Sequence, residues 1–123
     1  MAQITTFAQA CKKLGIAPKT LPDTSGLLKH LAKGTVAHYK LMVIVEALND
    51  GWKPDWNNSG QPKYFPWFDM EKDKNNPIGF RLSVVLVCCT YSYVGSRLCF
   101  QKREVAEYAA KTFLKLYRDY FLF

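Results

Sequence analysis

The segment from Thr35 to Asn49 constrains the fold more than any other part of the chain. Its apolar residues recur at steps of three and four, which is the spacing of a helix, and they form two adjoining stripes that cover most of the circumference. The stripes consist of Ala37, Leu41, Ile44 and Leu48, and of Val36, Tyr39, Val43 and Ala47. Such a helix has to be packed on more than one side, so the other elements must surround it. We predict that Thr35 caps this helix and that Gly51 ends it.

Two shorter helical segments are predicted before it. Residues 5–15 have an apolar face, a threonine cap at the start and a helix stop at Gly15. A loop with two prolines follows over residues 17–26. Residues 27–33 are then expected to form a short helical turn that ends at Gly34.

The last predicted element is an amphipathic helix from about Lys102 to Tyr120. Its apolar stripe consists of Val105, Ala109, Thr112, Phe113, Leu116 and Tyr120. Charged residues occupy the opposite face, so one side of this helix is expected to face the core and the other to face water.

Strands are predicted between these helices. The clearest runs from Gly79 to Tyr91, is rich in β-branched residues and is expected to be central in its sheet. Its inner face is predicted to consist of Phe80, Leu82, Val84, Leu86 and Cys88. Residues 64–70 form a second candidate strand, confined to an edge because Pro66 lacks an N–H, and residues 97–100 form a return strand.

Helices followed by strands and a final helix predict the α+β class. The 123 residues fit one domain spanning residues 1–123. We expect a small antiparallel sheet of about three strands packed against the helices at residues 35–49 and 102–120.

Three tryptophans, Trp52, Trp56 and Trp67, lie in a segment broken by prolines, glycine and asparagines. One interpretation is structural: the rings close the core under a folded loop, and Asp55 satisfies backbone donors of the turn. The other is functional: exposed rings stack on bases while nearby lysines contact phosphates. The structural interpretation is favoured, because residues 46–77 carry four lysines and six acids.

The net charge of +7 is distributed unevenly. Residues 1–45 contain six lysines and one acid, and residues 78–123 contain seven basic and three acidic residues. A surplus of this kind attracts polyanions without specifying a function. The N-terminus lacks a signal-peptide layout and the apolar runs are short, so a cytoplasmic protein without membrane association is expected.

Chemistry-bearing motifs are absent from the sequence. There is no glycine-rich phosphate loop, nucleophile elbow, Cys-x-x-Cys or His-x-x-x-His. The potential acid/base groups are His30, His38, Asp55, Asp69 and Glu71, of which His38 is expected to be a packed, hydrogen-bonded histidine and Asp55 to cap a turn. We therefore expect no catalytic residues, no metal site and no cofactor, with the four cysteines reduced.

Several blocks resemble a known family. They are Ala37–Leu41, Glu46–Asn58, Lys63–Asp69, Gly95–Phe100 and Glu104–Phe113. The chain is similar in these blocks to small uncharacterised proteins encoded in gut-bacterial genomes, phages and mobile elements. The resemblance implies an origin in a phage or mobile element, and it carries over no activity and no site residues.

The predicted function is that of a non-enzymatic accessory binding protein, with nucleic acid as the first candidate partner. The alternative is a protein-interaction or self-assembling module that uses the aromatic 52–68 loop or the C-terminal Phe-Leu-Phe. An enzyme of unknown type is the third hypothesis. The candidate binding residues are Arg81, Arg97, Lys102, Arg103, Lys53, Lys63, Trp52, Trp56, Tyr64 and Trp67.

Overall fold

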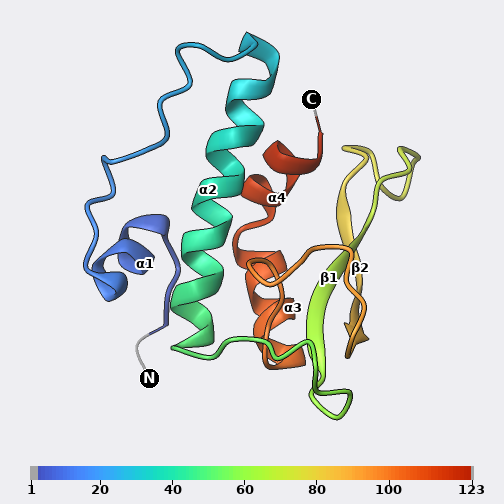
Figure 1. Cartoon of the computed structure of the whole chain (residues 1–123). Coiled ribbons are helices and arrows are strands. Elements are labelled where there is room, and N and C mark those ends of the chain that lie inside the picture. The colour runs from blue at the N-terminus through green and yellow to red at the C-terminus, as the bar shows by residue number, and fades with distance from the viewer. Residues whose placement is uncertain (1–2, 123) are drawn as a thin grey trace.

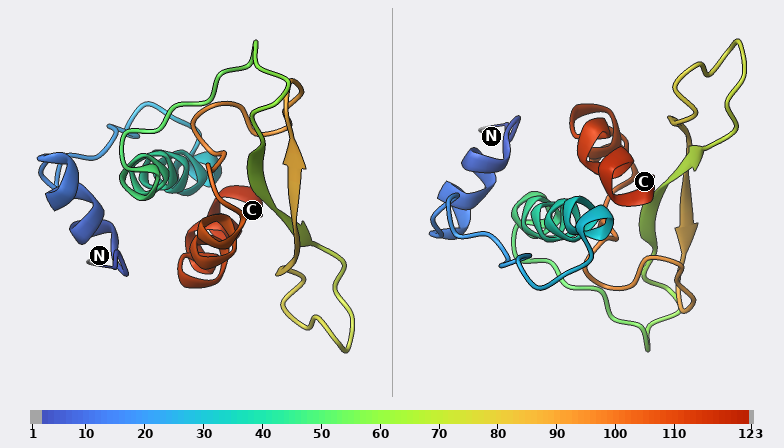
Figure 2. Two further views of the ribbon diagram at one scale, coloured as in Figure 1. Left: turned by 90° about the horizontal axis from the view of Figure 1, so that it is seen from below. Right: turned by 90° about the horizontal axis from the view of Figure 1, so that it is seen from above.

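A computed structural model describes residues 3–122, which form four helices and a two-stranded sheet (Figure 1). The helices are α1 (Phe7–Leu14), α2 (Lys29–Asn49), α3 (Arg103–Thr112) and α4 (Leu114–Phe121), and the strands are β1 (Lys63–Asp69) and β2 (Arg81–Cys88). Figure 2 shows the elements in series: the sheet, then α3 and α4, then α2, with α1 outermost. The α+β class is confirmed, although α2 packs mainly on α4 and α1 and lies further from the sheet than predicted.

The hydrophobic core lies between α2, α3 and the sheet. Leu41 and Ile44 of α2 are almost completely buried, as is Phe100 beside β1. The buried residues of α3 are all small: Ala106, Ala109 and Ala110. Small side chains let the α3 backbone lie close to its neighbours, so the large rings and leucines from other elements fill the remaining space.

Helix α1 has the ends that its sequence predicts. The Thr6 side chain accepts a hydrogen bond from the Gln9 backbone N–H, and the Gln9 side chain accepts one from Thr6 in return. Gly15 ends the helix in the left-handed conformation at φ 73°. These caps satisfy backbone groups that a helix end otherwise leaves without partners.

Helix α2 is longer than predicted, because it continues through Gly34. Thr35 is not a cap: its hydroxyl donates to the Leu31 carbonyl one turn earlier, at 3.1 Å. A Cβ atom at Gly34 would lie 3.5 Å from the Asp119 carbonyl oxygen, so the glycine lies where the α4 backbone passes close by. Glycine costs a helix about 1 kcal/mol relative to alanine, and packing against α4 outweighs that preference for a break.

The predicted third strand is reduced to one bridge. Tyr64 and Phe100 exchange two backbone hydrogen bonds on the side of β1 away from β2, at 2.9 and 2.7 Å. Successive residues of a strand point their N–H groups to opposite sides, so Pro66 occupies the next donor position on that side and has no N–H. Residues 97–100 therefore cannot extend the ladder, which explains why the sheet has two strands and not about three.

Strand β2 is not central, and its predicted inner face changes partway. Within residues 3–122 it pairs only with β1, and the register shifts between Trp67 and Phe68, where Ser83 is the extra residue. A bulge of one residue reverses which side chains face inward. Phe80 is buried as predicted, but beyond the bulge Val85 is buried while Val84 is exposed.

The C-terminal helix is divided at Phe113, which has a non-helical backbone at φ −110° and ψ 30°. Phe113 is itself buried, and Tyr117 is the buried residue of α4 in place of the predicted Leu116 and Tyr120. The change of direction brings Tyr117 within 5.1 Å of the Phe68 ring, measured between centroids. A single straight helix would not bring the bulky side chains of Phe113 and Tyr117 against both α2 and β1.

Tyr117→Phe is expected to raise the free energy of unfolding by about 1 kcal/mol. The Tyr117 hydroxyl is buried and has no hydrogen-bond partner among residues 3–122, and burial raises its pKa. Removing an unsatisfied polar group relieves its desolvation cost while the ring contacts remain. Urea denaturation checks this, and a less stable Tyr117→Phe protein would show that the hydroxyl is hydrogen-bonded in solution.

Asp119 joins α4 to α2 through lysines and should make stability depend on pH. Its carboxylate lies 3.2 Å from the Lys33 ammonium and 3.0 Å from that of Lys115, and its side chain is 10% exposed. Burial alone would raise the Asp119 pKa, but hydrogen bonds from Lys115 and Lys33 outweigh it and hold the pKa below its usual value. The Asp119 carboxylate therefore contributes to the free energy of unfolding above the unfolded-state pKa of about 3.9. This contribution is lost as the pH falls through the lower folded-state pKa.

Asp119→Asn is accordingly expected to cost about 1 kcal/mol at pH 7 and progressively less below about pH 4. Denaturation of both proteins at several pH values measures the difference. Glu71→Gln is the matched control, because Glu71 is exposed and has no ion pair among residues 3–122, so its removal should change stability little at any of these pH values. A difference between Asp119→Asn and wild type that stays constant from pH 7 to about 2.5 would contradict this account.

Candidate binding groove

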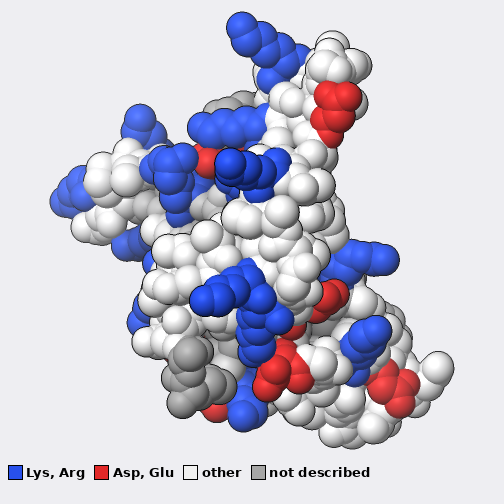
Figure 3. All heavy atoms as spheres, turned by 90° about the vertical axis from the view of Figure 1, so that its left-hand side faces the viewer, with Lys and Arg blue, Asp and Glu red and all other residues white. Residues whose placement is uncertain are grey.

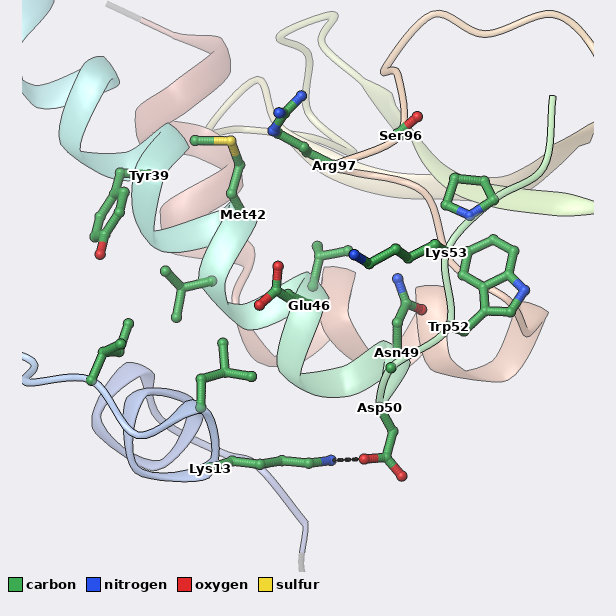
Figure 4. A pocket seen from close by; sticks show the side chains of 16 residues that line it. Lys13, Tyr39, Met42, Glu46, Asn49, Asp50, Trp52, Lys53, Ser96 and Arg97 are labelled. Carbon is green, nitrogen blue, oxygen red and sulfur yellow. Dashed lines mark ion pairs between the residues drawn. The ribbon is translucent and has the colours of Figure 1, made fainter.

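An open groove of about 910 Å³ lies between α1, the C-terminal half of α2, the loop that follows α2 and the segment before Leu98 (Figure 4). Its apolar lining includes Leu14, Ile16, Tyr39, Met42, Val43 and Trp52. Its charged lining consists of Lys13, Glu46, Asp50, Lys53 and Arg97. Among the predicted binding residues, the groove brings together Trp52, Lys53 and Arg97.

A left-handed turn at the end of α2 forms one wall. Asp50 and Gly51 have φ values of 50° and 88°, and the Trp52 N–H donates to the Asn49 carbonyl at 3.0 Å. Gly51 is left-handed as the sequence predicts, but the residue that caps the helix is Asp50, one position earlier. The turn folds the chain back at once, so the Trp52 side chain lies beside the helix that precedes it.

Asn49 fixes the opposite wall. This buried side chain donates to the Cys99 carbonyl at 2.9 Å and accepts from the Gln101 N–H at 3.3 Å. The two bonds attach the end of α2 to a segment about fifty residues later in the chain. Ser96 and Arg97 are thereby held beside the loop that contains Trp52.

An ion pair spans one end of the groove. The Lys13 ammonium of α1 lies 3.2 Å from the Asp50 carboxylate (Figure 4). The two side chains are 36% and 74% exposed, so water screens the pair and it contributes only about 0.2–1 kcal/mol. The ion pair therefore affects the shape of the groove more than the stability of the protein.

Two cations of the groove have no internal partner. Neither Lys53 nor Arg97 forms an ion pair or hydrogen bond with any part of the chain from residue 3 to 122. Lys53 extends over the groove in the direction of Glu46 on α2 (Figure 4). These cations lie beside an apolar lining, so the groove offers both apolar contact and charge to a ligand.

The rest of the tryptophan segment is mainly structural. The Trp56 indole N–H donates to the Ser96 hydroxyl at 2.6 Å, and Phe65 is 3% exposed. Asp55 accepts from the Asn57 N–H at 3.0 Å, which confirms its predicted role in the turn. Trp67 is the exception, because it is 45% exposed and its ring contacts only Tyr93 among the described rings.

Lys63 is not a surface cation, contrary to its place among the predicted phosphate contacts. The residue is fully buried, and its ammonium donates to the carbonyls of Gln61 and Cys89 at 3.0 and 2.5 Å. A longer bond of 3.5 Å reaches the Asn58 carbonyl, and the Trp56 ring lies 5.0 Å away. Lys63 therefore fastens the loop to the end of β2 and cannot contact an external polyanion.

Two of the predicted arginines also have internal partners. Arg81 donates twice to the Asp69 carboxylate, at 3.1 and 3.0 Å, and once to the Asn75 carbonyl. Asp69 has a lowered pKa, because it accepts from the Glu71 N–H and from Arg81. Arg103 donates to the Val85 carbonyl at 2.7 Å and lies over the Tyr64 ring at 5.1 Å. Both guanidinium groups stabilise the sheet, although both residues are exposed, which leaves Lys102 and Arg97 as the cations of the predicted basic site without a side-chain partner among residues 3–122.

The possible catalytic groups do not converge. The His38 ring stacks on Tyr120 at 4.6 Å, and Asp69 is paired with Arg81. Burial raises the pKa of the Cys99 thiol to about 11, which disfavours the nucleophilic thiolate. Within residues 3–122, no three His, Cys, Asp or Glu side chains are grouped so that they could hold a metal ion.

Sequence reasoning missed the helical half of the groove. Leu14 and Val43 belong to apolar helix faces that the sequence predicts to be buried, and Met42 belongs to neither of the stripes predicted for residues 35–49. The helix pattern shows which residues are apolar, but it does not show whether a neighbouring element covers them completely. No signal in the sequence distinguishes the lining of a groove from the interior of a core.

Comparisons of the chain with protein-family models, with curated proteins and with solved structures found no match. No described helix is both long and apolar enough to cross a membrane.

Proposed function

We propose that this protein is a non-enzymatic interaction module that binds a short segment of a partner protein in the groove between α1, α2 and the loop at residues 51–54. The observation that carries the proposal is the combination of an apolar lining with two cations, Lys53 and Arg97, that have no internal partner. A polypeptide segment with large apolar side chains and a carboxylate matches both features.

The charges of the groove favour a polypeptide over a nucleic acid as its ligand. Glu46 and Asp50 lie in the same lining as the cations and would repel consecutive phosphates. The lining from Leu14, Met42 and Val43 is aliphatic, whereas bases stack on aromatic rings. Trp52 and Tyr39 suit either ligand, so they do not decide between them.

Selection from a random peptide library tests the proposal. Peptides that bind the wild type are expected to combine apolar residues with at least one acid and to change the Trp52 fluorescence. Lys53→Glu and Arg97→Glu should each weaken a selected peptide by about tenfold or more. Lys72→Glu is the matched control, since Lys72 is exposed and lies outside the groove lining. Peptides that bind the two groove variants as tightly as the wild type would refute the proposal.

A second candidate function is nucleic-acid binding on a different face. Lys and Arg side chains are spread widely over the side that carries α1 and the following linker (Figure 3). Lys13 and Lys33 are paired with acids there, whereas Lys12, Lys19 and Lys29 have no ion pair within the described chain. This face supports contact with phosphates better than the predicted site at Arg81 and Arg103.

A salt titration of binding to single- and double-stranded DNA tests this candidate. Affinity should fall steeply with salt through counterion release, and an absence of binding at about 50 mM salt would refute it. Lys12→Glu should weaken binding, whereas Lys72→Glu should have less effect because Lys72 belongs to the loop between β1 and β2. A cytoplasmic location and an origin in a phage or mobile element are part of the same proposal and rest on the sequence alone.

A further inference from the structure

The outer face of the sheet is apolar, although no helix covers it. The helices all lie on one side of the sheet (Figure 2). On the other side, alternation along the strands places Phe65 and Trp67 of β1 beside Leu86 and Val84 of β2, their register partners. A sheet with one solvated face normally alternates apolar and polar residues, so a second apolar face indicates that something else covers it.

Part of this face is already covered within the chain. Phe65 is buried, and Tyr93 lies 6.3 Å from its ring and 5.9 Å from that of Trp67. Tyr93, Trp67 and Val84 remain 84%, 45% and 50% exposed. We call Trp67, Val84, Leu86 and Tyr93 the outer patch.

The charge distribution identifies what fits the outer patch. Residues 82–96 contain no charged side chain, although the whole chain has a net charge of +7. At one end of the patch Asp69 and Arg81 neutralise each other, and at the other end Lys63 is buried. Without cations the patch has no local attraction for a polyanion or an acidic partner. Two copies that meet through it bring no like charges into contact, so only the longer-range repulsion between their net charges remains.

We infer that the outer patch is a self-association surface that packs against the outer patch of a second copy. A two-fold interface places the same residues on both sides, and apolar side chains satisfy that requirement without complementary charges. This inference is independent of the groove and uses different residues.

The contact is between sheet faces and not between strand edges. The Tyr64–Phe100 bridge lies on the far side of β1, so Val85 points its carbonyl away from β1, toward the open edge of β2. Arg103 already donates to that carbonyl at 2.7 Å. An incoming strand would have to displace the guanidinium, whereas face-to-face packing leaves it in place.

Sedimentation velocity over a range of concentrations tests the inference. The wild type is expected to shift from the 14.1 kDa monomer to a dimer between about 1 and 200 µM. The shift should be easier at about 0.5 M than at about 0.15 M salt, because salt screens the repulsion between the +7 net charges. Val84→Lys and Trp67→Lys should each raise the dimer dissociation constant about tenfold or more.

Leu28→Lys is the matched control, because Leu28 is 64% exposed and lies at the N-terminal end of α2. It should dimerise as the wild type does, and circular dichroism of each variant checks that it folds. A wild type that stays monomeric at about 200 µM in both salts would overturn the inference. A dimer that is disrupted by Leu28→Lys but not by Val84→Lys would also overturn the inference.

Discussion

Lys63→Met is expected to lower the free energy of unfolding by about 3 kcal/mol. Methionine has nearly the length of lysine, so the apolar part of the side chain still fills its space. The carbonyls of Gln61 and Cys89 lose their common donor, and the Trp56 ring loses the cation above it. Each carbonyl left without a donor in a partly buried place costs about 1–3 kcal/mol, and this loss exceeds the gain from no longer desolvating an ammonium.

The loop at residues 56–62 should also become more mobile in the Lys63→Met protein. Urea denaturation measures the stability, and hydrogen exchange of the loop amides measures the local effect. Lys72→Met is the matched control, since Lys72 is exposed, and it should change stability by less than about 0.5 kcal/mol. If Lys63→Met were as stable as this control, the ammonium would not be holding the loop.

Asn49→Ala is expected to cost about 2–3 kcal/mol and to impair the groove. The substitution removes the donor to the Cys99 carbonyl and the acceptor for the Gln101 N–H. The bond to the Cys99 carbonyl is buried and the bond from the Gln101 N–H is partly buried, and alanine leaves a small cavity beside them. Since alanine is the better helix former, any change in helix propensity acts in the opposite direction.

Peptide binding should respond to Asn49→Ala more than the stability loss alone implies. Ser96 and Arg97 depend on these bonds for their position beside Trp52, so the affinity of a selected peptide should fall even where the protein is fully folded. Asn57→Ala is the control, because Asn57 is exposed and its side chain has no hydrogen bond among residues 3–122. If the Asn49→Ala protein bound the peptide with unchanged affinity, the peptide would have to bind outside the groove.

Much of the local structure could be predicted from the sequence. The ends of α1, the left-handed turn after α2 and the Asp55 turn follow from side-chain capping and from the freedom of glycine, which act within a few residues. The errors concern longer-range choices. Gly34 stays helical because α4 passes beside it, and the helix near Phe113 breaks because its rings face different partners.

The candidate site was less predictable than the fold. Trp52, Lys53 and Arg97 were chosen by residue type and do lie together. Lys63, Arg81 and Arg103 were chosen for the same reason, yet they bond to the protein itself. A basic side chain has the same appearance in the sequence whether its partner is a phosphate or a backbone carbonyl.

The sequence by itself determined that the chain forms an α+β domain around a helix that is apolar on most sides, because periodicity and capping are local properties. Only the tertiary structure decided how many strands pair, where α2 begins and which apolar faces remain open. A single missing N–H at Pro66 stops the third strand, and a single extra residue at Ser83 exposes Val84. Whether an apolar face becomes core, groove or outer patch depends on which distant element reaches it, and that depends on how the whole chain packs.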